Sequence, residues 1–381
     1  MNFWQHLEQP IIGLAPMDGV TDAVFRHIVA RYGGPDVIFT EFTNVNELCQ
    51  GQNRALQTLY YSEIERPVVA QLYGKEPEWF YRAAHIVCAL GFDGLDINMG
   101  CPSKNVAASG SGAALIRTPE RALAIVEAVK QGVHDWAAGQ SLTDVGIKPA
   151  LIQAIHHFNA QRGDTGFERR RMPIPVSIKT RLGYDTDIIE EWSACLIQGR
   201  PETITIHGRT LTQMYKGQAN WESIARAAAL IRKQGILVLG NGDIQSLTDA
   251  YDRIRQTGVH GILIGRAALG NPWLFQSTRA FRHAYRSRRR DGLVRPAIMM
   301  EDRCHLMLTH ARLFERVNGQ EAFPRMRKHL GWYCANFPHA AAMRAHMVKT
   351  KTSDEVAAIL EAYRRSRHDV PSSPPSSLIR I

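Results

Sequence analysis

The feature that most constrains the fold of this chain is a regular alternation of short apolar runs with helix-like stretches. Eight runs are rich in Val, Ile and Leu without strict alternation of polar and apolar positions: Ile11–Ala15, Val37–Glu41, Pro67–Leu72, Gly94–Asn98, Ile174–Thr180, Thr203–His207, Ile236–Asn241 and Gly261–Gly265. This pattern is typical of parallel strands that are buried on both faces of a sheet. The stretches between them with a helical pattern are Thr21–Tyr32, Pro77–Leu90, Pro119–Val129, Thr186–Gln198, Trp221–Lys233 and Ser246–Thr257.

Eight strands alternating with helices predict the α/β class and a (β/α)8 TIM barrel. An open, doubly wound sheet is the alternative. No GxGxxG motif follows the first run, which counts against a dinucleotide-binding domain of that kind. The chain has 381 residues, whereas a barrel usually takes about 250, so we expect a second module.

The expected organisation is a catalytic barrel at 1–285, a helical domain at 297–367 and a flexible tail at 368–381. The charged run Arg286–Pro296 reads as a linker between the first two. The stretches expected to form the last barrel helix and the helical domain are Trp273–Tyr285, Met299–Val317, Glu321–Asn336, Ala340–Lys349 and Ser353–Ser366.

Residues 131–172 form an insertion, because they are far longer than an ordinary connection between a helix and a strand. A helix-like piece, Pro149–Gln161, and a basic run, Arg169–Arg171, lie within it. Since the insertion precedes a strand, we expect it at the amino-terminal face of the barrel, away from the chemistry.

Composition excludes several classes of protein. The formal net charge of +10 suits a polyanionic partner such as a nucleic acid. The six cysteines include no CxxC pair, so we expect neither a metal site nor a disulfide framework, and the cytoplasm is the expected compartment. The amino-terminal residues do not resemble a secretory signal, and no apolar stretch reaches membrane-spanning length. We expect a monomer.

Polar residues and glycines fall where the predicted strands end. They are Pro16, Met17, Asp18, Glu41, Gln71, Asn98, Cys101, Lys179, Arg181, His207, Arg209, Asn241, Gly242, Asp243, Gly265 and Arg266. In a TIM barrel the carboxyl ends of all strands meet at one face, where active sites are built. Solvated strand ends would explain one or two such residues, but not eight strands in succession.

Cys101 follows the fourth run and precedes the small-residue stretch Ala107–Ala114. It therefore lies on a loop that can face a ligand, whereas Cys88 and Cys195 lie inside apolar stretches. From position and neighbours alone, a reactive thiol and a structural cysteine are about equally favoured.

The ends of the seventh and eighth strands commonly bind phosphate in such barrels. Gly242 and Gly265 permit close approach there, and Arg266 adds a charged partner. Lys179 suits either negative charge on a reduced flavin or a Schiff base in an aldolase. Gln71 and His207 suit a ring with several amide-like edges, as in a flavin.

Eight motifs in order resemble the bacterial tRNA-dihydrouridine synthases: APMDGVTD, TEF, VAQLYG, DINMGCPSKNV, SIKTRLG, IHGRT, GNGDI and IGRAALGNPW. The resemblance runs from about residue 11 to residue 275 and extends to the helical module. It implies FMN in a barrel, NADPH as reductant and a uridine of tRNA, in the D-loop, as substrate. The insertion at 131–172 is not recognised as part of the family core.

The resemblance also implies residue roles. The expected FMN contacts are Pro16, Met17, Asp18, Gln71, Lys179, His207, Asn241, Gly242, Asp243, Gly265 and Arg266, with Cys101 as the catalytic proton donor. The expected substrate contacts are Asn98, Arg181, Arg209, Arg286, Arg325, Arg327 and Lys328. Further arginines expected on an RNA-binding surface are Arg282, Arg288, Arg289 and Arg290.

The chemistry of uracil agrees with these roles. Its C5=C6 bond is conjugated to the C4 carbonyl, so hydride adds at C6 and a proton must reach C5, for which a protonated thiol suffices. A uridine in folded tRNA must be flipped out of its stack to react. The alternatives are a flavin barrel of the dihydroorotate-dehydrogenase type, against which the basic helical module argues, and a non-catalytic RNA-binding protein. The sequence leaves open which uridine is modified.

Overall fold

The computed structural model describes residues 2–163, 171–290, 293 and 297–368. It divides into two compact units. One comprises Met1–Ala268 with Pro272–Arg295, and the other comprises Leu269–Asn271 with Pro296–Ile381. Arg169, Arg170, the predicted tail from 369 onward and part of the predicted linker lie outside the described residues.

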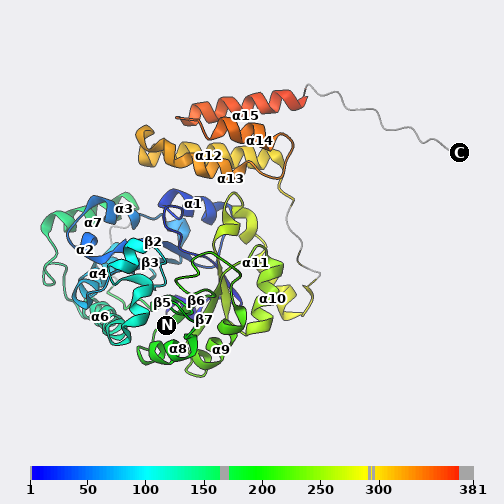
Figure 1. Cartoon of the computed structure of the whole chain (residues 1–381). Helices are drawn as coiled ribbons and strands as arrows, with labels where there is room; N and C mark the ends of the chain where they lie inside the picture. The colour runs from blue at the N-terminus through cyan, green and yellow to red at the C-terminus, as the bar shows by residue number, and fades with distance from the viewer. Residues whose placement is uncertain (1, 164–170, 291–292, 294–296, 369–381) are drawn as a thin grey trace. The chain divides into compact units, whose positions relative to one another are not determined.

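The first unit is a closed barrel of eight parallel strands in chain order, which confirms the predicted fold class (Figure 1). The strands are β1 (Ile11–Leu14), β2 (Ile38–Asn44), β3 (Val68–Tyr73), β4 (Gly94–Met99), β5 (Val176–Arg181), β6 (Thr203–His207), β7 (Leu237–Asn241) and β8 (Gly261–Ile264). β5 begins two residues later than predicted. Pro173 and Pro175 precede it, and a proline has no N–H to donate to a strand ladder.

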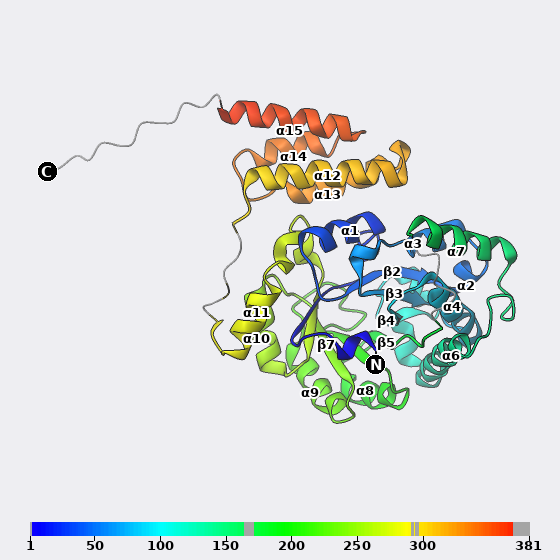
Figure 2. The ribbon, with the colours of Figure 1, turned by 180° about the vertical axis from the view of Figure 1, so that it is seen from behind.

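Helices surround the barrel (Figure 2). They are α1 (Ala23–Tyr32), α2 (Val45–Cys49), α3 (Asn53–Thr58), α4 (Pro77–Leu90), α5 (Lys104–Ala108), α6 (Pro119–Ala137), α7 (Pro149–Gln161), α8 (Ile189–Gln198), α9 (Trp221–Arg232), α10 (Leu247–Thr257) and α11 (Thr278–Arg286). Asp22 caps α1, since its side chain accepts from the Phe25 N–H at 2.9 Å. α11 begins later than predicted, because Pro272–Phe275 forms a separate 3-10 turn.

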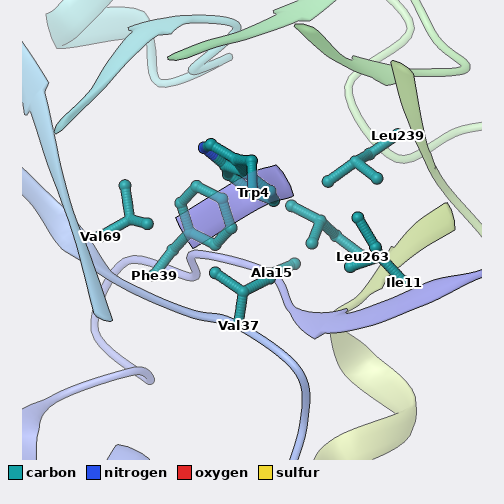
Figure 3. Packing of buried hydrophobic residues seen from close by; sticks show 8 residues of the cluster. All are labelled: Trp4, Ile11, Ala15, Val37, Phe39, Val69, Leu239 and Leu263. Carbon is teal, nitrogen blue, oxygen red and sulfur yellow. The ribbon is translucent and has the colours of Figure 1, made fainter. Parts of the chain in front are cut away.

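The barrel interior is a packed apolar core. Trp4, from the amino-terminal turn, is 2% exposed and lies among side chains of several strands (Figure 3). Val69, Leu239 and Leu263 belong to this cluster. Each is two residues before a predicted site residue on the same face of its strand. The apolar core therefore forms the floor beneath the site.

The insertion contains α7 as predicted, but its position corrects the expectation. α7 lies along the outer wall of the barrel beside α3 (Figures 1 and 2). The rings of Phe158 and Tyr60 stack with centroids 4.5 Å apart. Only its carboxyl end reaches the amino-terminal side of the barrel, where the Asn159 side-chain N–H donates to the Ala89 carbonyl at 2.8 Å. The aromatic pairing draws the helix against the wall.

The second unit is helical. Its helices are α12 (Met300–Asn318), α13 (Arg327–Tyr333), α14 (Ala340–Met347) and α15 (Ser353–His368). The single helix predicted at Glu321–Asn336 is divided into a 3-10 stretch, Gln320–Met326, and α13. Pro324 lies inside the 3-10 stretch and interrupts regular helical hydrogen bonding. No helix among the described residues is long and apolar enough to cross a membrane.

Candidate active site

The parallel register brings the predicted residues together at the carboxyl ends of the strands. Gln71 on β3 is level with Asp96 on β4, and Asp96 is level with Ser177 on β5. Two residues further along, Asn98 is level with Lys179. On the other side of the barrel, Arg181, His207 and Asn241 are level on β5, β6 and β7. These neighbouring positions form one candidate site.

Asp96 lies at the bottom of the site and is fully buried. One carboxylate oxygen accepts from the Gln71 Nε2 at 2.7 Å, and the other accepts from the Ser177 Oγ at 2.7 Å. Burial raises the pKa of Asp96 to about 6, although both hydrogen bonds and the charge of Lys179 oppose the rise. The carboxyl is therefore ionised in neutral solution.

Asn98 joins this layer to the cysteine loop. Its Nδ2 donates to the Gln71 Oε1 at 2.9 Å, and its Oδ1 accepts from the backbone N–H groups of Gly100 at 3.0 Å and Cys101 at 2.8 Å. Cys101 is 7% exposed. Burial raises the pKa of its thiol above the ordinary value, so the group is protonated at neutral pH. A protonated thiol can act as an acid, whereas a nucleophile would need the thiolate.

The loop after Cys101 is more ordered than a run of small residues suggests. It contains α5 and a 3-10 stretch, Gly112–Arg117. Gly112 has φ +61°, and a Cβ at this position would lie 3.2 Å from the Cβ of Cys101. Glycine is required there both for the backbone conformation and for the close approach to the cysteine.

Lys179 and Arg181 differ in what they do. Burial, followed by the charge of Arg181, lowers the pKa of Lys179 to about 8. In the part of the chain that the structure describes, the Lys179 ammonium forms no hydrogen bond or ion pair. Arg181 is 4% exposed and donates to the carbonyls of Gly100 at 2.6 Å and Thr210 at 3.0 Å. It ties the cysteine loop to the loop after β6, and the substrate contact by Arg181 stays a prediction.

Arg209 likewise links two loops, those after β6 and β7, by hydrogen bonds. It is 2% exposed, and its Nη2 donates to Asp243 and to the Gly217 carbonyl, both at 2.6 Å. Asp243 also accepts from the Ala219 N–H at 2.8 Å and from Arg266 at 2.9 Å. The Asp243 carboxylate is therefore occupied by protein donors and holds Arg266 in place. Arg266 remains half-exposed, at 54%, and can meet a ligand.

The donors of the site fit a flavin. The buried Nδ1 of His207 lacks a hydrogen-bond partner among the described residues, so a ligand could satisfy it. Burial, followed by the charges of Arg181 and Lys179, lowers the pKa of His207 well below its ordinary value, which keeps the ring neutral. A Cβ at Gly265 would lie 3.3 Å from the Met17 Sδ, so the glycine avoids a tight contact with that side chain. Neutral imidazole, amide and ammonium groups are suitable partners for the amide-like edges of the ring.

Sequence reasoning missed two members of the site, Asp96 and Ser177. The signal was available, since each lies two residues before a predicted site residue on a buried strand and so shares its face. Glu41, in contrast, was among the predicted strand-end residues and lies within β2. Burial, followed by the charge of Asp22, raises its pKa to about 7. None of the groups of His, Cys, Asp and Glu in the described residues could hold a metal ion.

The predicted RNA-contacting residues lie elsewhere in the chain. Arg282 is a correction, because it is 8% exposed and pairs with Asp36 inside the barrel unit. Arg286 is exposed and lies 3.6 Å from Glu8. In the second unit Arg325 is exposed, whereas the Arg327 Nε donates to the Thr350 carbonyl at 2.8 Å. Lys328 is partly exposed on the same helix as Arg327.

Comparison with known proteins gives the family. The family model described as dihydrouridine synthase matches residues 13–140 and 168–367. The chain belongs to the dihydrouridine synthase family. The chain is 34% identical over 376 residues to a probable tRNA-dihydrouridine synthase 2 of Bacillus subtilis, with 97% of this chain and 98% of that protein covered. It is 32% identical to a probable tRNA-dihydrouridine synthase of Staphylococcus epidermidis, with 95% and 96% covered.

Family membership confirms the predicted flavin-dependent oxidoreductase. Residues 141–167 of this dihydrouridine synthase fall between the two matched segments, inside the predicted insertion. Solved structures with similar folds include DHODH from Eimeria tenella in complex with ferulenol, at 12% identity and a TM-score of 0.46 over 74% of this chain and 84% of that one. Morphinone reductase in complex with tetrahydroNAD has a TM-score of 0.42 at 12% identity over 73% and 88%.

Proposed function

We propose that this protein reduces the C5=C6 bond of a uridine in tRNA to give 5,6-dihydrouridine, using FMN bound in the barrel and NADPH as reductant. The observation that carries the proposal is Cys101, a buried and protonated thiol held over the carboxyl ends of the strands. The family and the names of its relatives support the same reaction. We further propose that it acts as a monomer in the cytoplasm.

The residues that would hold FMN surround the same opening. Gln71, Lys179 and His207 would contact the ring, and Arg266 with the backbone near Gly242 and Gly265 would hold the phosphate. The remaining proposed contacts are Pro16, Met17, Asp18, Asn241 and Asp243. Bound FMN would supply the hydride that adds to C6 of uracil.

Cys101 supplies the other half of the reduction. Its Sγ–H donates a proton to C5 as the C5=C6 bond is lost, leaving a thiolate that solvent must reprotonate before the next turnover. The raised thiol pKa keeps the proton on the sulfur before the transfer, because burial destabilises the thiolate. The charges of Arg181 and Lys179 oppose this rise and so ease the loss of the proton. Lys179 provides positive charge beside the reacting groups and opposes the accumulation of negative charge.

The helical unit is proposed to bind tRNA through exposed basic side chains, Arg325 among them. These contacts would hold the RNA while the uridine is flipped out of its stack. Asn98 remains a proposed substrate contact, since it lies beside Cys101 at the end of β4.

The test uses purified protein, NADPH and an unmodified tRNA transcript. We expect a yellow protein whose flavin is bleached by NADPH and reoxidised by tRNA, with the RNA gaining the mass of two hydrogens per product. Bleaching of the flavin by dihydroorotate, with no reoxidation by tRNA, would favour the other flavin barrel. Binding of tRNA without any bleaching would favour a non-catalytic RNA-binding protein.

A further inference from the structure

The hydrogen bonds behind Cys101 form a chain whose direction is set at its buried end. Asp96 is fully buried, and both of its oxygens accept hydrogen bonds at 2.7 Å. An ionised carboxylate can only accept. Gln71 must therefore turn its NH₂ group, and not its carbonyl oxygen, toward Asp96.

That choice decides the orientation of the next amide. With its Nε2 directed at Asp96, Gln71 presents its Oε1 to Asn98 and accepts from the Asn98 Nδ2 at 2.9 Å. The Oδ1 of Asn98 must then face the other way. It accepts from the backbone N–H groups of Gly100 and Cys101 at 3.0 and 2.8 Å. The Asp96 carboxylate at one end and the two backbone N–H groups at the other thus require the same orientation of the two amides.

The position of the chain in the barrel supports a role for its direction. Gln71, Asp96 and Ser177 are level on three adjacent strands, and Asn98 lies one layer nearer the site. The charge of Lys179 acts on Asp96 from β5 and favours the ionised form. Asp96 is buried away from solvent, and its direct partners are the neutral donors Gln71 and Ser177. Water therefore does not compete for its oxygens, and their need for donors influences the cysteine loop through Gln71 and Asn98.

We propose that Asp96 is a positioning residue, which orients Cys101 for proton delivery by fixing the orientation of the Gln71 and Asn98 amides. The inference rests on the proposed function, in which Cys101 protonates C5. Asp96 does not touch the substrate in this scheme. If the Asn98 amide were reversed, its NH₂ group would face two backbone N–H groups, and the cysteine loop would lose its anchor.

The test separates the two half-reactions in Asp96→Asn. An asparagine has the same shape but can present either a donor or an acceptor to Gln71, so the direction is no longer enforced. We expect oxidation of the reduced flavin by tRNA to slow by about tenfold or more, because it needs the Cys101 proton. Reduction of the bound flavin by NADPH should stay within about twofold of wild type, because it does not need that proton. The Kd for FMN is measured separately, because Gln71 is also a proposed flavin contact.

Asp93→Asn is the matched control. Asp93 precedes the same strand at its other end, where it accepts from the Val68 N–H at 2.8 Å and pairs with Arg66 at 2.8 Å. Both half-reactions should stay within about twofold of wild type in the folded control protein. Equal slowing of both half-reactions in Asp96→Asn, or loss of its FMN, would show a general structural role and overturn the inference.

A double-mutant cycle with Cys101→Ala tests whether Asp96 acts through the cysteine. In the Cys101→Ala background, Asp96→Asn should slow flavin oxidation by less than about twofold further, because residues that act as a unit are not additive. A full additional loss would overturn the inference. Wild-type oxidation rates in Cys101→Ala would contradict the proposed role of Cys101, whereas wild-type rates in Asp96→Asn alone contradict only the present inference.

A pH profile gives a readout that does not depend on Asp96→Asn folding. Flavin oxidation by tRNA should fall on acidification with a midpoint near the Asp96 pKa of about 6. The neighbouring Lys179 has a pKa of about 8, the Cys101 pKa is raised and the His207 pKa lies well below its ordinary value. Glu41 has a pKa of about 7, so the profile is measured both in wild type and in Glu41→Gln, which lacks that carboxyl. Absence of the lower midpoint in both proteins would contradict the inference.

Discussion

Cys101 is buried and is also the proposed proton donor of the reaction. Its burial keeps the thiol protonated, and its backbone N–H is anchored by Asn98 at 2.8 Å. A nucleophilic cysteine would instead need a cationic partner that lowers its pKa. At this scale the environment of one side chain distinguishes an acid from a nucleophile.

Replacement of Cys101 by Ala should leave FMN binding and reduction by NADPH intact, because neither step uses the thiol. Dihydrouridine formation should fall by about 10²–10⁴-fold, the usual contribution of a general acid. Rapid-mixing measurements of both half-reactions and mass analysis of the RNA provide the check. A wild-type yield would rule out the assigned role.

Arg266→Ala should weaken FMN binding. A lost hydrogen bond to a charged group costs about 1.5–3 kcal/mol, and since Arg266 is half-exposed we expect the lower part of that range, or a Kd about tenfold higher. Arg290→Ala is the matched control, because Arg290 is also exposed and pairs with an aspartate, Asp252, at 2.7 Å. Flavin titration of both variants gives the comparison, and equal affinities would place the phosphate elsewhere.

Asp96 should reduce stability in neutral solution. Its pKa is raised from 3.8 to about 6 in the folded protein, so the favourable contribution of the neutral form is present below pH 4 and is lost as the pH rises through 6. At about 1.4 kcal/mol per pKa unit the loss is on the order of 3 kcal/mol. Asp96→Asn should therefore have a Tm at least equal to that of wild type at pH 8, and its advantage should shrink toward pH 4. A lower Tm at pH 8 would contradict this assignment.

At the scale of elements, the strands and most helices followed from the sequence because apolar runs and proline caps are local signals. α4 and α7 have the predicted bounds. The predictions of helix bounds and positions failed where a single residue or a tertiary contact determines them. Pro324 divides one predicted helix, and stacking on Tyr60 places α7 on the barrel wall. The site residues were predicted from strand ends, whereas the partners of Asp96 depend on the register between strands, which no local pattern encodes.

The cysteine loop is sensitive to one glycine. Ala at Gly112 would adopt a strained φ of +61° and bring its Cβ to 2.9 Å from Val106 and 3.2 Å from Cys101. Gly112→Ala should therefore slow flavin oxidation by tRNA and leave reduction by NADPH unchanged. The control is Gly163→Ala, which has φ +83° but no neighbour within 4 Å. If both variants lose only Tm and not the oxidation rate, the loop does not depend on this contact.

At the scale of the whole molecule, the chain separates into a barrel unit and a helical unit. The barrel contains every proposed flavin contact. Leu269–Asn271, immediately after the phosphate-binding end, is grouped with the helical unit. A Cβ at Gly270 would lie 2.3 Å from the Trp332 carbonyl oxygen, which shows how closely that segment packs.

Truncation after Arg290 should keep a folded, yellow barrel that NADPH can reduce, with some loss of Tm because Leu269–Asn271 loses its packing. It should not bind tRNA, and binding by the full chain should fall steeply with salt as phosphate contacts release counterions. Filter binding across a salt series compares the two proteins. Undiminished binding by the truncated protein would assign the RNA to the barrel or to the insertion near Arg171.

The pairing of β1 has a consequence for synthesis on the ribosome. β1 is joined to β8 through four residue pairs but to β2 through one, Leu14 with Ile38. β1 is synthesised first, whereas its main partner, β8, is synthesised last. At about 5–20 residues per second, the interval between them is on the order of ten to fifty seconds. During this time the apolar edge of β1 is open to other nascent chains. A gene rearranged so that β8 is translated directly before β1 would pair β1 at once and transfer the wait to β8, because its other partner, β7, would then be made last.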